Sequence, residues 1–416
     1  MGLRTLLGLK RRGAAKAADG ATSSLRIHGG DAFFSLAKAA LNNSDRLIAA
    51  LTENEAPLFD LVLAHEIRIS GLAGLRAAEQ FGADRRILDN VEYPHLAGRS
   101  SPAVAKVAQA DPLGAKLLSA WLAEVANNYD RVLATSQGQC DALREIGVRT
   151  PIDLLRNARL FQPDVSSTEI RDRCGCLGGD VLLLHCGNIH AQSGAEQAVR
   201  ALAILPPQFR LCFLGQIRHD EDELRELASA PDLAHRITFL DPVPPGELIR
   251  LSAGADLSII PLLPDTLNHQ HCLPNRVFES IAARNPIVAP SMIELGRFVA
   301  ENGIGVTFDS FEPESMGRAI QLADAKRRSC QFQAPLSAAA QKFSWEREQR
   351  PLSDIAGAGA GRSALLAACK IIERNDRVYR QTKTLMNLGY QVTVAANSMP
   401  MLELRHRDVR YILLPR

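Results

Sequence analysis

Short apolar runs alternate with stretches of helical periodicity along most of this 416-residue chain, and the alternation occurs in two series. The first series includes the run Leu58–His65 (LFDLVLAH), and the second opens with Val181–Cys186 (VLLLHC). Apolar strands separated by helices are typical of parallel sheets that are covered on both faces. A chain of this length accommodates two domains, so the sequence predicts an α/β protein with two doubly wound parallel sheets.

The composition bounds the function class. Hydrophobic residues make up 46% of the chain and support real cores, while a formal charge of +2 argues against a dedicated nucleic-acid binder. No apolar run reaches the roughly 20 residues that span a bilayer. We expect no signal peptide, because the early apolar run is short and basic residues follow it. The eight cysteines form no CxxC pair, which favours reduced, buried thiols in a cytoplasmic protein.

The first 24 residues are basic and then small and polar, so we expect a flexible tail. Its Leu, Arg and Lys residues would permit peripheral contact with an anionic membrane, although one short amphipathic turn binds weakly. A second change in composition, rich in Ser and Gly, lies at residues 161–180. We interpret it as the connection between the two domains.

Residues 268–290 combine features that suit a phosphate ligand. They predict a polar loop, a helix opened by Pro274 and a buried strand at Ile287–Ala289. Arg276 falls in the first helical turn, where its charge opposes the helix dipole. A cation beside unpaired backbone N–H groups suits an anion. Glu279 lies off the apolar stripe of this helix; an ordinary solvated glutamate is the alternative interpretation.

The stretch Leu-Pro-Asn-Arg-Val-Phe-Glu, followed by Asn-Pro-Ile-Val-Ala, resembles the donor-site segment of retaining nucleotide-sugar glycosyltransferases of family 4. The resemblance implies the GT-B fold, with two Rossmann-like domains facing across a cleft. It implies that Glu279 holds the donor ribose and that Arg276 acts catalytically on the diphosphate. Asn275 and His271 would also belong to the donor site. Relatives often carry a second glutamate at the position of His271.

The segment 187–194 resembles the glycine loop that wraps the donor diphosphate in this family. Gly187, Asn188 and His190 would bind the donor there, since small residues let backbone N–H groups approach a phosphate. Relatives usually have Arg or Lys near Ser193, so one phosphate contact is missing. No metal or other cofactor is expected, because the His269/His271 pair has no completing ligand by spacing and the resemblance implies metal-independent transfer.

The stretch FDLVLAHE resembles the acceptor domain of the same family. The histidine that would meet the transferred sugar is replaced by Val91. His65, at the end of the neighbouring strand, is therefore the candidate catalytic histidine in this domain. A structural role for His65 is the alternative, since a single histidine at a strand end is more often structural.

The C-terminal part departs from the family's chain order. Residues 344–355 resemble its last, crossing helix, 356–362 form a Gly/Ala linker, and 363–416 resemble the family's first β-α-β-β unit. No strand like ALLAACKII precedes Leu58, and without one the acceptor sheet would lack its central strand.

We therefore predict a circular permutation. An acceptor domain would be built from 25–160 plus 363–416, with a donor domain at 161–343. Arg377 or Arg380 would then face the donor phosphates, or lie on a solvated helix face. A truncated tandem transferase is the alternative, and parallel pairing of strand 365–371 with strand 60–64 would decide against it.

The functional hypothesis is glycosyl transfer from a nucleotide diphosphate sugar, with retention, in the synthesis of cell-surface polysaccharide or glycoconjugate. The acceptor would be a glycan, a lipid-linked sugar or a protein. The departures at Val91, Ser193 and His271 favour a second hypothesis, a nucleotide-sugar-binding or scaffold protein of weak or no activity. A nucleotide-sugar epimerase is a third, but we find no acid/base constellation for it.

Overall fold

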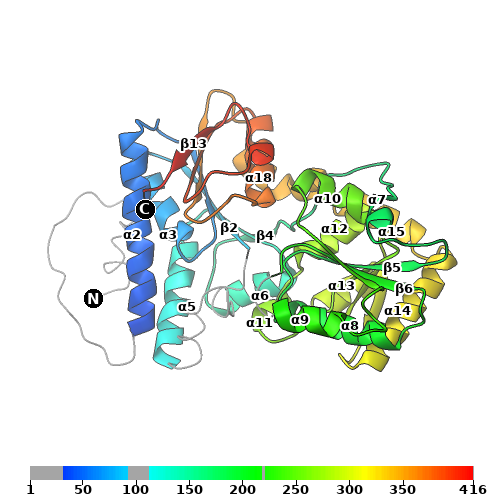
Figure 1. Cartoon of the computed structure of the whole chain (residues 1–416). Coiled ribbons are helices and arrows are strands. Elements are labelled where there is room, and N and C mark those ends of the chain that lie inside the picture. The colour runs from blue at the N-terminus through cyan, green and yellow to red at the C-terminus, as the bar shows by residue number, and fades with distance from the viewer. Residues whose placement is uncertain (1–30, 92–111, 218–220, 416) are drawn as a thin grey trace. The chain divides into compact units, whose positions relative to one another are not determined.

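The computed structural model describes residues 31–91, 112–217 and 221–415, which divide into two compact units. Unit 1 consists of the described parts of Met1–Leu155 and Pro351–Arg416, and unit 2 is Arg156–Arg350 (Figure 1). Each unit contains one sheet, and every pair of neighbouring strands within the two sheets is parallel. This is the predicted α/β class with two doubly wound sheets.

The sheet of unit 1 is assembled from both parts of the chain. Its seven strands have the order β13-β12-β11-β1-β2-β3-β4. They are β1 (Leu61–His65), β2 (Arg85–Asn90), β3 (Arg131–Ala134), β4 (Ile152–Leu154), β11 (Ser363–Ala368), β12 (Gln391–Ala396) and β13 (Arg410–Leu413). Counted from β11, this is the order 3-2-1-4-5-6 of a doubly wound nucleotide-binding sheet, with one further strand at the edge.

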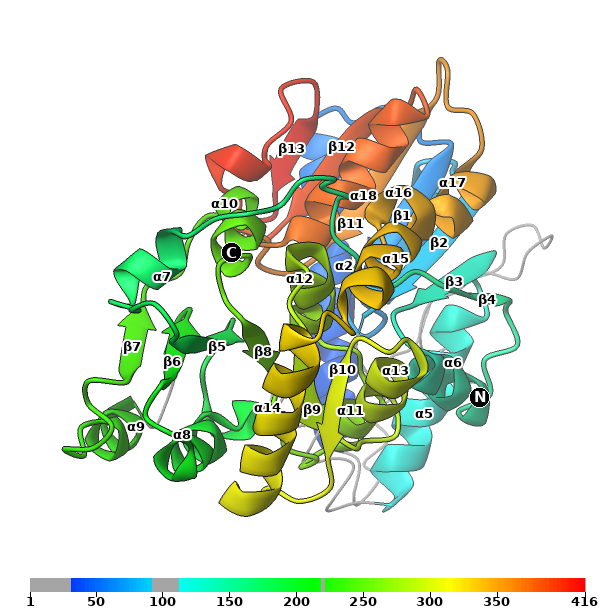
Figure 2. The ribbon, with the colours of Figure 1, turned by 90° about the vertical axis from the view of Figure 1, so that its right-hand side faces the viewer.

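The contact that was predicted to distinguish permutation from a tandem arrangement is present. Strand β1 pairs with β11 in parallel, in a register that runs from Leu61 opposite Ala364 to Ala64 opposite Ala367. Figure 2 shows β11 and β12, from the orange and red end of the colour scale, beside the blue β1. The C-terminal segment therefore supplies a central strand of the sheet, next to β1.

Helices cover the sheet of unit 1. They are α2 (Asp31–Glu53), α3 (Ser70–Gln80), α5 (Pro112–Ala126), α6 (Gln137–Glu145), α17 (Arg350–Ala356) and α18 (Asp376–Asn387), with a 3-10 turn η2 (Leu402–Leu404). Trp121 of α5 is fully buried in the core that α2, α3 and α5 share. Ser136 caps α6 by accepting a hydrogen bond from the backbone N–H of Gln139 at 3.2 Å, as serine commonly does at a helix start.

Unit 2 has the same sheet order in one continuous segment. Its strands are β5 (Val181–Cys186), β6 (Phe209–Leu214), β7 (Ile237–Leu240), β8 (Leu257–Ile259), β9 (Ile287–Pro290) and β10 (Gly305–Phe308). They lie in the order β10-β9-β8-β5-β6-β7. Counted from β5, this is again the order 3-2-1-4-5-6.

The helices of unit 2 alternate with these strands. They are α7 (Glu169–Arg173), η1 (Ala191–Ser193), α8 (Ala195–Ile204), α9 (Glu221–Ala228), α10 (Pro245–Ser252), α11 (Leu267–His271), α12 (Asn275–Ala283), α13 (Leu295–Glu301), α14 (Pro313–Arg328), α15 (Gln333–Lys342) and α16 (Trp345–Glu348). The stretch before Pro274, predicted as a loop, forms the short helix α11, which Thr266 caps. Pro274 is the residue before the first turn of α12 rather than a part of it.

The Gly/Ala connection between α17 and β11 is packed, whereas a flexible linker was predicted. Gly359 is buried and its N–H donates to the Leu388 carbonyl at 2.7 Å. A Cβ added to Gly359 would lie 2.2 Å from Cδ2 of Tyr390. The predicted crossing helix is divided into α16 and α17. The predicted basic tail lies outside the described residues, and no described helix has the length and apolarity to cross a membrane.

Candidate functional site

In doubly wound sheets, ligands bind at the carboxyl ends of the two strands where the strand order reverses. In unit 2 these are β5 and β8, which pair with each other. The glycine loop 187–194 follows β5, and the segment that begins at Pro261 follows β8. The predicted donor segments therefore meet at the edge of the sheet where this topology binds ligands.

The glycine loop is held in one conformation by its neighbours. Gly187 and Gly194 have φ values of +101° and +72°, which side chains disfavour. A Cβ added to Gly194 would lie 1.8 Å from the Pro261 carbonyl oxygen. The backbone also bonds outward, since Leu263 N donates to Gln192 O at 3.0 Å. Glycine at position 194 is thus required for the loop to pack against the segment after β8.

The polar side chains of the loop differ in their exposure and in the hydrogen bonds they already form within the protein. Ser193 is fully buried, and its hydroxyl donates to the His190 carbonyl at 2.6 Å while accepting from His190 N at 3.1 Å. His190 Nδ1 lies 3.1 Å from Gln192 Oε1. Asn188 is exposed. Ser193 therefore stabilises the loop itself and supplies no cation.

Arg276 lies in the first turn of α12, as predicted, with a half-buried side chain. Its Nη1 is 3.2 Å from Nε2 of His185, and a Cβ added to Gly187 would lie 3.9 Å from Arg276 Cδ. Within the described part of the chain, no carboxylate forms an ion pair with Arg276. Burial lowers the pKa of the guanidinium. A partly desolvated cation beside a glycine and a helix start is the arrangement that binds a phosphate.

Glu279 is buried, with 7% of its surface exposed, so the solvated alternative is wrong. Its Oε1 accepts a hydrogen bond from Nη2 of Arg159, in an ion pair. Burial and then the charge of Glu279 raise the pKa of the neighbouring Cys186 thiol. The buried carboxylate is therefore paired with an arginine that was not predicted from the sequence. The sequence around Arg159 contains no pattern that would predict its pairing with Glu279, which lies 120 positions later.

The other residues assigned to the donor site have protein partners nearby. The Asn157 side chain donates to Oδ1 of Asn275. His271 is half-buried at the end of α11. His269 Nδ1 lies 2.9 Å from the Leu263 carbonyl oxygen, so it anchors the segment after β8. In the parts of the chain that the structure describes, no three His, Cys, Asp or Glu side chains are grouped as a metal site would need.

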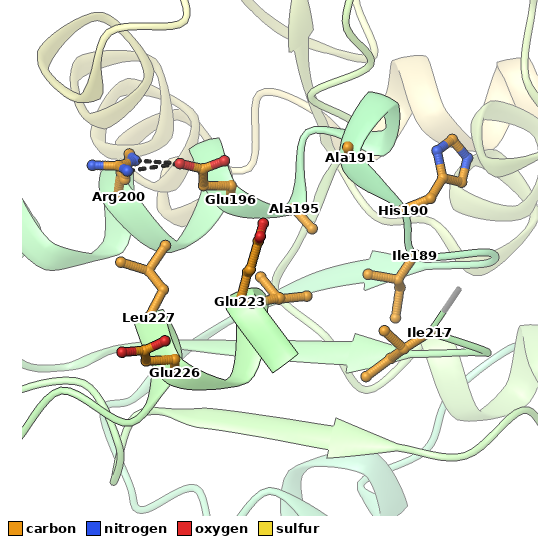
Figure 3. A pocket seen from close by; sticks show the side chains of 11 residues that line it. Ile189, His190, Ala191, Ala195, Glu196, Arg200, Ile217, Glu223, Glu226 and Leu227 are labelled. Atoms are coloured by element: carbon orange, nitrogen blue, oxygen red, sulfur yellow. Dashed lines mark hydrogen bonds and ion pairs between the residues drawn. The ribbon is translucent and has the colours of Figure 1, made fainter. Parts of the chain in front are cut away.

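A pocket of about 390 Å³ lies beside the glycine loop, between α8 and α9. Figure 3 shows His190, Ile189 and Ile217 on one side and the carboxylate of Glu223 near its centre. Glu196 and Glu226 also line the pocket, and Glu196 is paired with Arg200 at 2.6 Å. Three carboxylates disfavour a diphosphate in this pocket.

In unit 1, the corresponding edge of the sheet contains a buried charge cluster. Asp89, at 0% exposure, accepts from Nε and Nη2 of Arg377 at 2.8 and 2.5 Å. It also accepts from Gln381 Nε2 and from His65 Nδ1, each at 2.8 Å. Burial alone would raise the Asp89 pKa, but Arg377 and His65 outweigh it and hold the pKa well below its usual range.

His65 was predicted to be catalytic, with a structural role as the alternative. The ring is 1% exposed and bonded on both sides, because Nε2 also lies 3.4 Å from Asn375 Nδ2. An ionised Asp89 can only accept, so the proton is on Nδ1. Burial and the charge of Lys370 lower the His65 pKa to about 4, against the opposing effect of Asp89.

The alternative interpretation for Arg377 and Arg380, a solvated helix face, is wrong. Neither lies on a solvated helix face, since their exposures are 3% and 2%. Arg377 forms a buried ion pair with Asp89. Arg380 Nε lies 3.5 Å from Asp376 Oδ2, on the same helix. Val91 is half-buried, and its carbonyl accepts from Gln139 Nε2 at 3.0 Å.

Comparison with known families gives the decisive observation for unit 2. Residues 180–323 match the family described as glycosyl transferases group 1. This segment is therefore similar to a group 1 glycosyltransferase domain. The matched range contains the glycine loop, Arg276 and Glu279, so the resemblance inferred from those residues is confirmed.

Curated relatives of this group 1 domain include two D-inositol 3-phosphate glycosyltransferases. That of Xylanimonas cellulosilytica is 29% identical over 47% of this chain and 48% of its own length. That of Corynebacterium diphtheriae is 28% identical over 49% of each chain. The chain thus spans about half the length of the curated relatives it matches.

Solved structures with the same fold extend the likeness to both units. Sucrose-phosphate synthase from Thermosynechococcus elongatus has a TM-score of 0.58 at 17% identity, over 80% of this chain and 82% of the other. HepE from Anabaena, in complex with UDP, has a TM-score of 0.57 at 16% identity, over 77% and 80%. The fold is therefore GT-B, as the resemblance implied.

Proposed function

We propose that the chain transfers a glycosyl group from a nucleotide diphosphate sugar to a hydroxyl acceptor, with the donor bound at the carboxyl ends of β5 and β8. This proposal rests on the state of Arg276: its guanidinium is half-buried and has no carboxylate partner in the described residues. It adjoins Gly187, and α12 begins one residue before it. Each of these features favours the negative charge of a diphosphate.

In the proposed reaction, the bond between the anomeric carbon and the diphosphate oxygen breaks, and its electron pair stays on the diphosphate. The acceptor hydroxyl oxygen bonds to the anomeric carbon, and its proton passes to the departing diphosphate. Arg276 and the N–H groups at the start of α12 stabilise the developing charge, which is commonly a large part of catalysis. We propose that the configuration at the anomeric carbon is retained, because the sequence resembles retaining glycosyltransferases.

Glu279 is proposed to accept hydrogen bonds from the donor ribose. Its carboxylate forms an ion pair with Arg159, and Glu279 is only 7% exposed. A charged acceptor binds hydroxyls about twice as strongly as a neutral one. Arg159 would therefore be a positioning residue for the ribose contact.

The test measures binding of UDP and of UDP-glucose by calorimetry, together with transfer to a panel of acceptors. UDP is a rational first probe because HepE was crystallised with it, and D-inositol 3-phosphate belongs in the panel because of the named relatives. We expect Arg276→Leu to weaken UDP binding by about tenfold or more, since hydrogen bonds to charged groups contribute about 1.5–3 kcal/mol. Arg297→Leu is the matched control, because Arg297 pairs with Glu294 at 2.9 Å. Equal UDP affinity in the wild type, Arg276→Leu and Arg297→Leu would exclude Arg276 as a ligand of the diphosphate.

The second candidate function is nucleotide-sugar binding without turnover. The buried Ser193 favours it, because its hydroxyl is used within the loop and supplies no cation. Donor binding with neither transfer to any acceptor nor hydrolysis would support this function. Transfer to one acceptor of the panel would exclude it.

A further inference from the structure

His185 is a buried residue of the proposed donor site to which the mechanism above gives no role. It is the fifth residue of β5, two positions before Gly187, and 0% of its surface is exposed. One face of the ring packs against Phe213, with ring centroids 5.3 Å apart. Its position in the apolar run VLLLHC suggests an ordinary core residue, so only its polar contacts reveal another role.

One ring nitrogen of His185 has two polar neighbours with opposite requirements. Nε2 lies 3.1 Å from the carbonyl oxygen of Ser193 and 3.2 Å from Nη1 of Arg276. A carbonyl can only accept a hydrogen bond, and a guanidinium can only donate one. A neutral imidazole carries a proton on one nitrogen and a lone pair on the other. Nε2 can therefore donate to Ser193 or accept from Arg276, but it cannot do both at once.

Each choice of tautomer has a consequence for the other nitrogen. Nδ1 of His185 is buried and has no hydrogen-bond partner among the described residues. When Nε2 accepts from Arg276, the proton is on Nδ1, where a buried donor stays unsatisfied. When Nε2–H donates to Ser193, Nδ1 is left as an unpaired acceptor in place of an unpaired donor, and Arg276 loses its acceptor. Protonation of both nitrogens does not resolve the conflict, because burial and Arg276 lower the His185 pKa to about 3.

The two neighbours belong to the two parts of the proposed diphosphate site. Arg276 is on α12, and Ser193 is in the glycine loop, next to Gly194, which packs against Pro261. An anion that takes the hydrogen bonds of the guanidinium removes the reason for Nε2 to accept. The nitrogen can then donate to Ser193 and fix the end of the loop.

We propose that His185 is a positioning residue that exchanges one hydrogen bond for another when the diphosphate binds: its Nε2 accepts from Arg276 in the empty site and donates to the Ser193 carbonyl in the occupied one. The inference rests on the proposed function, since it takes the diphosphate to bind at Arg276. It goes further by coupling the cation of α12 to the glycine loop through a single ring.

The tautomer of His185 is directly measurable in the full chain. Histidine labelled with ¹⁵N is introduced, and long-range ¹⁵N–¹H correlations identify which ring nitrogen carries the proton. The His185 signals are assigned by their loss in His185→Gln, since the chain has 10 histidines. Spectra are compared for the wild type, for Arg276→Leu and for the wild type saturated with pyrophosphate or UDP. Arg276→Met is the second variant, in case Arg276→Leu does not fold.

We expect Nε2 to lack a proton in the empty wild type and to carry one in Arg276→Leu without any ligand. Pyrophosphate should convert the wild type to the tautomer of the variant. An unchanged tautomer in both Arg276 variants, or in the wild type with bound pyrophosphate, overturns the exchange and leaves the proposed function intact. Failure of pyrophosphate and UDP to bind at all, measured by calorimetry, overturns the proposed function and the exchange with it.

Discussion

The two units share one strand order but use buried charge in opposite ways. In unit 1, Asp89 is surrounded by donors from Arg377, Gln381 and His65, and the cluster is closed to solvent. In unit 2, Glu279 is paired with Arg159, while Arg276 is half-buried and contacts an imidazole in place of a carboxylate. A closed cluster stabilises a fold, whereas an unneutralised cation at a sheet edge is available to a ligand.

The difference follows from how each sheet is built. Unit 2 is continuous, so its strands need no special connection between distant segments. Unit 1 joins two parts of the chain, and the Asp89 cluster links β2 to α18 across 288 positions. We propose that the sheet of unit 1 is a circularly permuted copy of the family order, since counting from β11 restores 3-2-1-4-5-6. The buried cluster then fixes the C-terminal segment in place.

The largest expected effect is the loss of the Asp89 carboxylate. Asp89→Leu leaves the guanidinium of Arg377 buried without its counter-charge, which typically costs about 3–5 kcal/mol. We expect this loss in the free energy of unfolding, measured by urea denaturation. The double variant Asp89→Leu/Arg377→Met should recover part of it, because no uncompensated charge remains.

Asp45→Ala is the matched control, because Asp45 pairs with Arg76 but is 64% exposed. Exposed ion pairs contribute about 1 kcal/mol or less. A cost for Asp89→Leu as small as that of the control would mean that unit 1 does not depend on its closed cluster.

The next effect concerns the glycine loop of unit 2. Gly194→Ala places a Cβ 1.8 Å from the Pro261 carbonyl oxygen, at a residue with a φ of +72°. Such backbone strain costs about 1–3 kcal/mol, and the loop must also move away from the segment after β8. We expect a lower melting temperature and weaker UDP binding, measured by calorimetry.

Gly246→Ala is the control for this comparison, because nothing lies within 4 Å of a Cβ added there. It should leave UDP binding unchanged. If Gly194→Ala behaves like Gly246→Ala in both measurements, the close packing of the loop is not needed for the proposed site.

A smaller effect is expected in the pH dependence of stability. The pKa of His65 is about 4 in the folded chain, against a usual value of 6.5. Between pH 6.5 and 4 the unfolded chain binds a proton at this position that the folded chain does not, so the free energy of unfolding falls as the pH falls. His65→Asn keeps a donor towards Asp89 and removes the titration, so its stability should fall less steeply over this window.

His235→Asn provides the control, because it removes a histidine that is exposed rather than buried. Urea denaturation at several pH values measures both variants. A slope for His65→Asn that equals the wild-type slope would contradict a neutral, buried His65.

The sheets and their order were predictable from sequence, because apolar runs mark strands and a doubly wound sheet needs a central first strand. The position of ALLAACKII after the donor domain predicted the β1–β11 pairing. The charge partners were not predictable. Asp-Arg-Val-Tyr-Arg reads as a polar helix start, and its burial depends on Asp89 in a distant segment. His185 within an apolar strand and Arg159 before unit 2 likewise acquire meaning only from their neighbours in space.

The smallest effect is expected when the connection between α17 and β11 is cut by a protease. A protease site can be inserted after Gly361 without a steric clash, because no atom lies within 4 Å of a Cβ added there. Cleavage should leave residues from Ser363 onward bound to the rest through gel filtration, since β11 pairs with β1 and Arg377 is bonded to Asp89 inside the core. The same cut in Asp89→Leu should release the segment more readily, because the buried cluster is broken. A segment that separates from the intact chain on cleavage would mean that the C-terminal strands are an appended piece, and the comparison between a permuted and a continuous sheet would no longer hold.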